Sequence, residues 1–192
     1  NRDSGAGVTV LMRYTLRLLT IQQFERASSL ICACEALRRQ EPGELGSAEF
    51  SIGLWVGKGS TPNTRKDARQ ALDKLRANNP VPKGNPIQLH RCPWCGTRLD
   101  HRNYWLTDTD PRLVVGCKKS SCDFENGLPV LLVDEDIYEN RPSLIIATAD
   151  KFASLPWSEI TASLFNLDSD DGPPELIIQD ELHLISGPLG TL

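Results

Sequence analysis

Two adjacent acidic residues near the carboxyl end of the chain have the types and spacing that metal-assisted hydrolysis requires. The segment ELIIQD at residues 175–180 contains three apolar residues and ends in Asp180. Glu181 comes next, and His183 follows two residues after it. A buried strand that ends in paired carboxylates can hold Mg²⁺ through one acid and activate a water molecule through the other. The alternative interpretation is a solvated strand end with no chemistry.

Four cysteines have the spacing of a structural metal site. Cys92 and Cys95 form one short-spaced pair, and Cys117 and Cys122 form a second pair farther along the chain. Two such pairs can direct four sulfurs at one tetrahedral ion, and the segment between them is typical of a hairpin around Asp-Thr-Asp-Pro. Four sulfur ligands leave no open position for a substrate, so the pattern predicts a structural zinc ribbon. Four reduced structural thiols are the alternative.

Other residues in and around this segment carry weaker signals. His90 and His101 are surplus to a four-cysteine site and are expected at the surface. Cys32 and Cys34 lie two residues apart on a predicted helix and point to different faces, so both are expected to be packing residues. Basic side chains of the ribbon could contact phosphates or form a solvated basic face; they are Arg91, Arg98, Arg102, Lys118 and Lys119.

Two segments imitate nucleotide-site motifs. GLWVGKGST at residues 53–61 follows a predicted strand but departs from the phosphate-loop pattern G-x-x-x-x-G-K-[ST]. Ile52 stands where the first glycine is required, and Gly59 follows the lysine in place of Ser or Thr. LLVDED at residues 131–136 brings an apolar strand to three acids, and its simpler interpretation is a strand end followed by a solvated acidic turn.

Composition and charge limit the broad class of protein. The chain has 192 residues, of which 40% are hydrophobic and 24% charged, and it contains no apolar run long enough to span a membrane. Six cysteines without secretory features favour metal or free thiols and a cytoplasmic location over disulfides. Residues 83–119 are rich in Lys and Arg, whereas residues 152–192 contain neither, so a polyanion would meet the earlier segment first.

Apolar periodicity predicts an α/β fold. Buried strands are expected at residues 7–14, 50–56, 128–133, 143–148 and 175–180, with helices at 21–39 and 64–79. This order predicts a mostly parallel sheet with helices on both faces. The expected division is an α/β domain at residues 1–86 and 128–192, interrupted by an inserted zinc ribbon at residues 87–127. The ribbon is expected to have a core of its own, so that metal removal would leave the sheet folded.

Three segments resemble, in their order and their strand-then-loop contexts, motifs Ia, Ib and II of superfamily 2 helicases. They are LMRYTLRLLTIQQFERA (11–27), IIATADKF (145–152) and IIQDELH (177–183). The fuller phrases RYTLRLLT-x-QQ, TADKFASLPW and QDELHLISGPLGTL resemble the DrmA-type helicases of DISARM anti-phage systems. The resemblance implies an incomplete first RecA-like domain. Its phosphate-binding loop is expected before residue 1, and motif III and the second RecA-like lobe are expected after residue 192.

The resemblance also implies roles for individual residues. Asp180 would hold the Mg²⁺ that bridges the phosphates of ATP, Glu181 would orient and deprotonate the attacking water, and His183 would couple the nucleotide state to the nucleic-acid motifs. The residues expected to line a track for a nucleic-acid backbone are Thr15, Arg17, Thr20, Gln23, Thr148 and Lys151, with Asp150 acting as a helix cap. Arg17 has a second interpretation, a surface arginine that covers the first helix.

The resulting hypothesis is part of an ATP-dependent helicase or translocase in anti-phage defence, acting on DNA, or on RNA, alongside other defence proteins. The fragment alone is expected to hydrolyse no ATP, because nothing in it cradles the phosphates. The competing hypothesis is a non-enzymatic zinc-ribbon module that binds nucleic acid and in which the DELH segment is incidental. A G-x-x-x-x-G-K-[ST] sequence upstream of residue 1 would distinguish the two.

Overall fold

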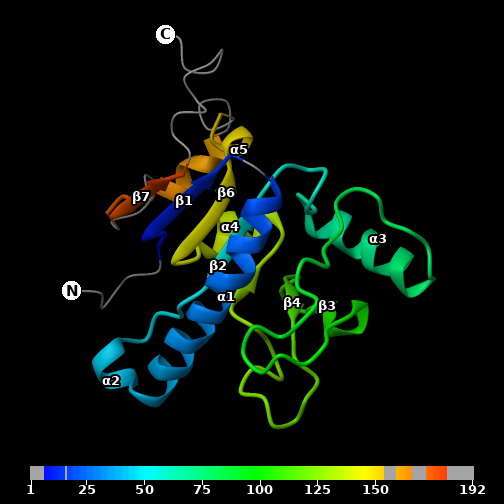
Figure 1. Cartoon of the computed structure of the whole chain (residues 1–192), viewed down its shortest axis with the longest axis horizontal. Coiled ribbons are helices and arrows are strands. Elements are labelled where there is room, and N and C mark those ends of the chain that lie inside the picture. Colours follow the sequence, from blue (N-terminus) through cyan, green and yellow to red (C-terminus); the bar gives the residue numbers. More distant parts are fainter. Residues whose placement is uncertain (1–6, 16, 154–158, 166–171, 181–192) are drawn as a thin grey trace.

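A parallel β-sheet forms the centre of the protein (Figure 1). The computed structural model describes residues 7–15, 17–153, 159–165 and 172–180. Within them, the sheet has five strands in the order β5-β2-β6-β1-β7, and every neighbouring pair is parallel. The strands are β1 (Val10–Tyr14), β2 (Ile52–Trp55), β5 (Val130–Leu131), β6 (Leu144–Thr148) and β7 (Leu176–Gln179). The predicted α/β class with a mostly parallel sheet is confirmed.

Helical segments cover both faces of the sheet, because its central strand is apolar on both sides. In β6, Leu144 and Ile146 pack into the same cluster as Phe24 of α1 (Arg17–Gln40), whereas Ile145 packs with Ile137 of α4 (Asp134–Asn140). Successive strand residues point to opposite faces, so this alternation places α1 and α4 on opposite sides. A 3₁₀ segment, η3 (Glu159–Phe165), adds Leu164 to the α4 side.

Local sequence explains where the main helices begin and end. The buried side chains of α1 recur at Phe24, Ser28 and Ile31, and the helix stops before Pro42, which opens the short α2 (Pro42–Leu45). In α3 (Arg65–Arg76), the side chain of Thr64 caps the first turn by accepting the backbone N–H of Asp67 at 3.0 Å. Both helices correspond to the two predicted from periodicity.

The acidic segment LLVDED differs from its simplest interpretation. Strand β5 spans only Val130–Leu131, and the acids belong to the first turn of α4. A helix amino terminus favours acidic side chains because its free N–H groups carry partial positive charge. Asp134 and Asp136 are buried, so the expected solvated acidic turn is wrong. The apolar run therefore correctly predicted that this segment is buried, but it did not indicate that the strand ends after Leu131 and that a helix begins at Asp134.

The cysteine-containing segment forms a small antiparallel hairpin packed on the main sheet domain. Strand β3 (Tyr104–Leu106) follows a 3₁₀ turn, η1 (His101–Asn103), and pairs with β4 (Leu113–Val115) around the predicted Asp-Thr-Asp-Pro turn. Tyr104 and Leu113 belong to the same hydrophobic cluster as Phe24 of α1. The expectation that the ribbon has its own core is therefore wrong, since one continuous core joins it to the helix. The proposed domain boundaries stay predictions.

None of the helices in the described part of the chain combines the length and apolar character needed to cross a membrane.

Candidate functional site

The three segments that carry the helicase-like motifs meet at one edge of the sheet. Strand β1 lies between β6 and β7, with Tyr14 opposite Thr148 and Arg13 opposite Gln179. The backbone N–H of Asp180 donates to the carbonyl of Arg13 at 3.0 Å, which continues the ladder past the end of β7. The carboxyl ends of all three strands therefore lie side by side (Figure 1). Ligands of open α/β sheets bind outside this edge.

Asp180 is exposed at the carboxyl end of β7. Burial raises the pKa of the Tyr14 hydroxyl, and the negative charge of Asp180 raises this pKa further. A carboxylate oxygen at such an edge is a suitable ligand for a hard divalent cation such as Mg²⁺. Glu181 and His183, the other predicted catalytic residues, lie outside the described residues.

Two predicted track residues present hydroxyl groups at neighbouring positions of this edge. Thr15 follows β1 and Thr148 ends β6. Among the described residues, neither hydroxyl oxygen has a hydrogen-bond partner, although both atoms are buried. Most buried polar side-chain atoms in proteins are hydrogen-bonded, so two unsatisfied hydroxyls at one edge are unusual. Both can donate to a phosphate oxygen if their side chains rotate outward.

The remaining predicted contacts near the start of α1 differ in how far they are exposed. Arg17 is the first residue of the helix, and Gln23 is partly exposed. Thr20 is fully buried, because it lies four residues before Phe24 on the stripe that packs against the sheet. The burial of Thr20 does not favour its predicted contact with a nucleic-acid backbone, which stays a prediction.

The side chain of Lys151 is also largely buried. It lies in α5 (Ala149–Ala153), and its ammonium donates to the carboxylate of Asp134, with side-chain exposures of 13% and 4%. The same ammonium lies 5.6 Å from the centre of the Trp55 ring. Burial raises the pKa of Asp134, and Lys151 opposes that rise. This pairing argues against the predicted phosphate contact of Lys151. Asp150, the expected cap, is exposed in the first turn of α5.

The four predicted metal-ligating cysteines come together. Their sulfur atoms all lie within 4.8 Å of one another. Cys92 Sγ is 3.9 Å from Cys122 Sγ, and Cys95 Sγ is 3.5 Å from Cys117 Sγ. Four sulfurs about 2.3 Å from a tetrahedral zinc ion would be about 3.8 Å apart. The observed spacing therefore fits such an ion, and the cluster could hold a metal such as zinc.

Tight turns place these thiols. Gly96 adopts a positive φ of 74° immediately after Cys95, and its N–H donates to the carbonyl of Cys92 at 2.9 Å. On the other side, the N–H of Cys117 donates to the carbonyl of Phe124 at 3.0 Å. Burial raises the pKa of the Cys92 thiol. Burial also acts on the Cys95 thiol, but hydrogen bonds with Thr97 and the neighbouring thiols outweigh it and lower the pKa of Cys95 to about 6. A metal ion binds all four cysteines as thiolates, and its positive charge would stabilise them.

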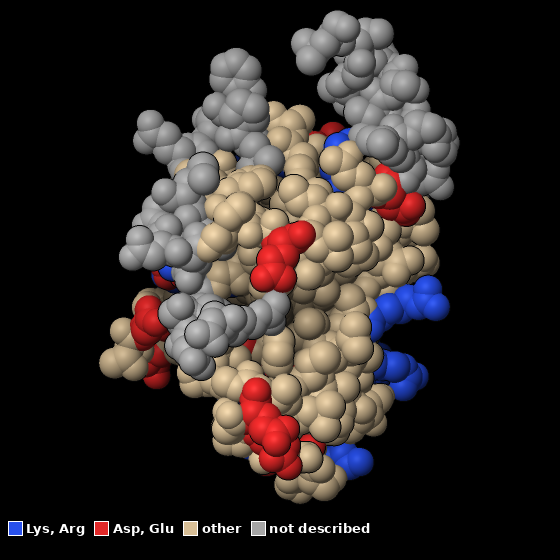
Figure 2. Space-filling model, turned by 90° about the vertical axis from the view of Figure 1, so that its left-hand side faces the viewer, with Lys and Arg blue, Asp and Glu red and all other residues tan. Residues whose placement is uncertain are grey.

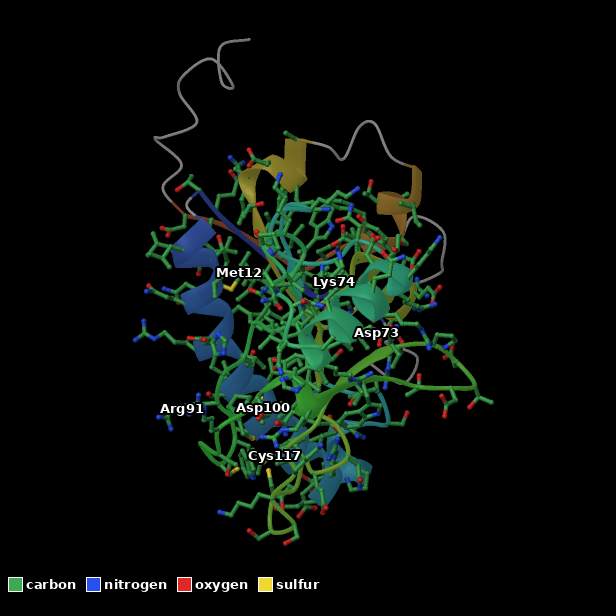
Figure 3. All side chains as sticks on the ribbon, turned by 90° about the vertical axis from the view of Figure 1, so that its right-hand side faces the viewer. Met12, Asp73, Lys74, Arg91, Asp100 and Cys117 are labelled. Carbon is green, nitrogen blue, oxygen red and sulfur yellow. The ribbon has the colours of Figure 1, made fainter. Side chains whose placement is uncertain are left out.

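The surplus residues behave largely as predicted. His90 is exposed, and His101 opens the η1 turn and is not part of the group formed by the four sulfurs. Cys32 is buried as a packing residue, and burial raises its pKa to about 12, whereas Cys34 is partly exposed. The basic residues Arg91, Arg98, Arg102, Lys118 and Lys119 are exposed. Figure 3 shows Arg91 at the outer surface of the ribbon.

Buried carboxylates were missed by reasoning from the sequence. Asp136 is fully buried and accepts the Arg65 guanidinium at 2.6 Å and the backbone N–H of Leu113 at 3.0 Å, which ties α3, α4 and β4 together. Glu35 accepts both Arg38 and Arg39 at 2.8 Å. The sequence offers one signal for such a buried carboxylate, which is an acidic residue inside an otherwise apolar run.

Comparison with known proteins identifies a relative along nearly the whole sequence. The DISARM protein DrmA of Bacillus paralicheniformis (strain ATCC 9945a / NCIMB 11709 / CD-2) is 40% identical over 227 aligned residues, which cover 99% of this chain and 20% of that protein. The chain thus spans about a fifth of the length of this relative. No family model matches the chain. The similarity to DrmA predicted from the motifs is confirmed.

Proposed function

We propose that this DrmA-like chain forms part of the first RecA-like domain of an ATP-dependent superfamily 2 helicase or translocase that acts in anti-phage defence. The observation that carries the proposal is the adjacency of β6, β1 and β7. The motif-bearing segments are far apart in the sequence, yet their strands are neighbours, and all three carboxyl ends point to one edge. The similarity to DrmA supports the defence role.

The nucleotide chemistry is assigned to the end of β7. Asp180 would hold Mg²⁺, which neutralises charge on the phosphates of ATP when both are bound. Glu181 would orient the attacking water and accept its proton, and His183 would couple this step to nucleic-acid binding. The exposed position of Asp180 at the carboxyl edge supports the first assignment.

The nucleic-acid track is assigned to the neighbouring ends of β1 and β6. Thr15 and Thr148 offer hydroxyls, and Arg17 and Gln23 lie in the first two turns of α1. Backbone phosphates suit hydroxyls and helix amino termini, and such contacts carry no base information. DNA is the proposed substrate, with other proteins of the defence system as partners. Thr20 and Lys151 were also predicted to line this track, but Thr20 is buried and Lys151 pairs with Asp134, so their proposed role is to support this edge from the interior.

The four cysteines are assigned a structural zinc ion. Cys92, Cys95, Cys117 and Cys122 supply a complete sulfur shell, so the ion would stabilise the hairpin and take no part in hydrolysis.

Replacement of Glu181 in the full-length protein tests the enzymatic assignment. Glu181→Gln should bind ATP with unchanged affinity but hydrolyse it at least about 100-fold more slowly, since a positioned general base contributes that much or more. Glu175→Gln, the same substitution just before β7, is the matched control and should retain activity. Normal hydrolysis by Glu181→Gln would remove the catalytic role from this motif.

A second candidate function is supported by the exposed basic residues beside the four cysteines. Arg91, Arg98, Lys118 and Lys119 could bind backbone phosphates without any nucleotide chemistry. The ribbon would then be the nucleic-acid module. Substitutions at the two locations distinguish these functions.

A further inference from the structure

A cavity of about 490 Å³ lies beside the carboxyl edge, between the loop that follows β2, helix α3 and the loop at residues 81–84. Three lysines from these three segments line it: Lys58, Lys74 and Lys83. All three are exposed, and Figure 3 shows Lys74 on α3. We call this feature the lysine groove. Figure 2, which draws the side of the molecule away from α3, shows mostly uncharged surface with scattered acidic residues, and its Lys and Arg side chains project mainly at the right-hand margin.

The lysine groove has a rigid wall. The loop after β2 closes through the N–H of Ser60, which donates to the carbonyl of Gly57 at 2.7 Å. The side-chain amide of Gln88 donates to the carbonyl of Ser60 at 3.1 Å, and the N–H of Gly84 donates to the carbonyl of Gly59 at 3.4 Å. These bonds hold the loop from two sides. A wall fixed in advance lowers the ordering cost of binding a ligand.

The charge of the lysine groove favours an anion. Among the lining residues that the structure describes, Asp67 is the one carboxylate facing three ammonium groups. Gln70 adds an amide, while Ala71 and Val81 supply apolar surface. Lysine ammonium groups on flexible stems adapt to phosphates and give contacts that depend on charge more than on shape. A ligand that carries phosphate groups matches this lining.

The position of the groove is in line with the proposed track. Trp55 of β2 lies opposite Ala147 of β6, so the loop that begins after β2 emerges beside Thr148. A strand of nucleic acid that crosses the ends of β1 and β6 would therefore meet the segment of Lys58 next. We infer that the lysine groove binds backbone phosphates of a single nucleic-acid strand and extends the track beyond β6. This inference rests on the proposed function.

Single-stranded DNA binding by the full-length protein tests the inference. Lys58→Ala, Lys74→Ala and Lys83→Ala should each weaken binding of unrelated oligonucleotides to a similar degree. Each should also reduce the slope of log K against log salt by roughly 0.7, and the triple variant by roughly 2. The matched control is Lys66→Ala, because Lys66 is exposed on α3, the helix that carries Lys74, but does not line the groove.

The same variants separate a nucleic-acid strand from a free nucleotide as the phosphate source. ATP affinity should be unchanged in the triple variant. Unchanged DNA affinity with weakened ATP binding would assign the groove to a nucleotide and overturn the inference. If the triple variant binds DNA with unchanged affinity while Arg17→Ala binds it more weakly, the groove does not bind the strand. The proposed track at the ends of β1 and β6 would still stand. An unaltered protein that binds no single strand would overturn the inference and the proposed track together.

Discussion

Lys151 lies between the Asp134 carboxylate and the face of Trp55, with only a small part of its side chain exposed. A lysine at this point of the motif can either bind a phosphate or stabilise the fold through an internal ion pair, and the sequence is the same in both cases. The pairing with a buried carboxylate favours the fold, because an unpaired charge at Asp134 would be costly. Thr148 is buried as well, but its hydroxyl has no hydrogen-bond partner among the described residues, so it stays a candidate for contact with a ligand.

Replacement of Lys151 should therefore act on stability. Lys151→Ala leaves the Asp134 carboxylate buried without its cation, and removing one member of such a pair destabilises by about 3 kcal/mol or more. Urea unfolding measures this change, and Lys66→Ala, an exposed lysine, should alter stability by less than about 0.5 kcal/mol. Equal stability of the two variants, with weaker DNA binding by Lys151→Ala alone, would restore the phosphate contact.

At the scale of elements, the cysteine hairpin and α1 depend on each other. Tyr104, Val115 and Cys117 share a hydrophobic cluster with Ile31 of α1. The guanidinium of Arg39, in the last turn of α1, lies 4.9 Å from the centre of the Phe124 ring, beside the second cysteine pair. The four-cysteine cluster therefore lies in a segment that packs on the helix as well as on its own loops.

Metal removal should affect both elements. The purified chain should contain about one zinc ion, and a strong chelator should increase hydrogen exchange in residues 87–127 and in the carboxyl half of α1. Structural zinc contributes on the order of 10 kcal/mol to the folding of small zinc fingers, so the effect should be large. Cys117→Ala should reproduce it, whereas Cys34→Ala, outside the cluster, should not. A well-folded, unchelated sample without zinc would contradict the metal assignment.

The elements also show what could be predicted from the sequence. Local periodicity gave the parallel α/β class and both long helices, and cysteine spacing gave the sulfur cluster. Periodicity did not show that the acids after β5 begin a helix, because an apolar run has the same appearance in either case. It also could not pair Asp136 with Arg65 or Asp134 with Lys151, since these partners are set by tertiary packing.

At the scale of the whole molecule, the two candidate nucleic-acid surfaces lie in different places. The motif-bearing strands end at the carboxyl edge of the sheet, beside the lysine groove. The hairpin lies toward the other edge, where Trp105 and Asn126 line a cavity of about 510 Å³ together with Ser51 and Ser143, the residues just before β2 and β6. Figure 1 shows this separation between α5 and the β3–β4 hairpin. Substitutions at the carboxyl edge and at the exposed basic residues of the ribbon can therefore be compared directly.

Single-strand affinity in the full-length protein, measured over a range of salt, tests the central claim most directly. Arg17→Ala should weaken binding about equally for unrelated sequences and reduce the salt slope by roughly 0.7, the value for one phosphate contact. Lys118→Ala and Lys119→Ala, on the ribbon, should have smaller effects. Binding that survives Arg17→Ala but collapses when Lys118 and Lys119 are replaced would contradict the track at the sheet edge and make the zinc ribbon the nucleic-acid module.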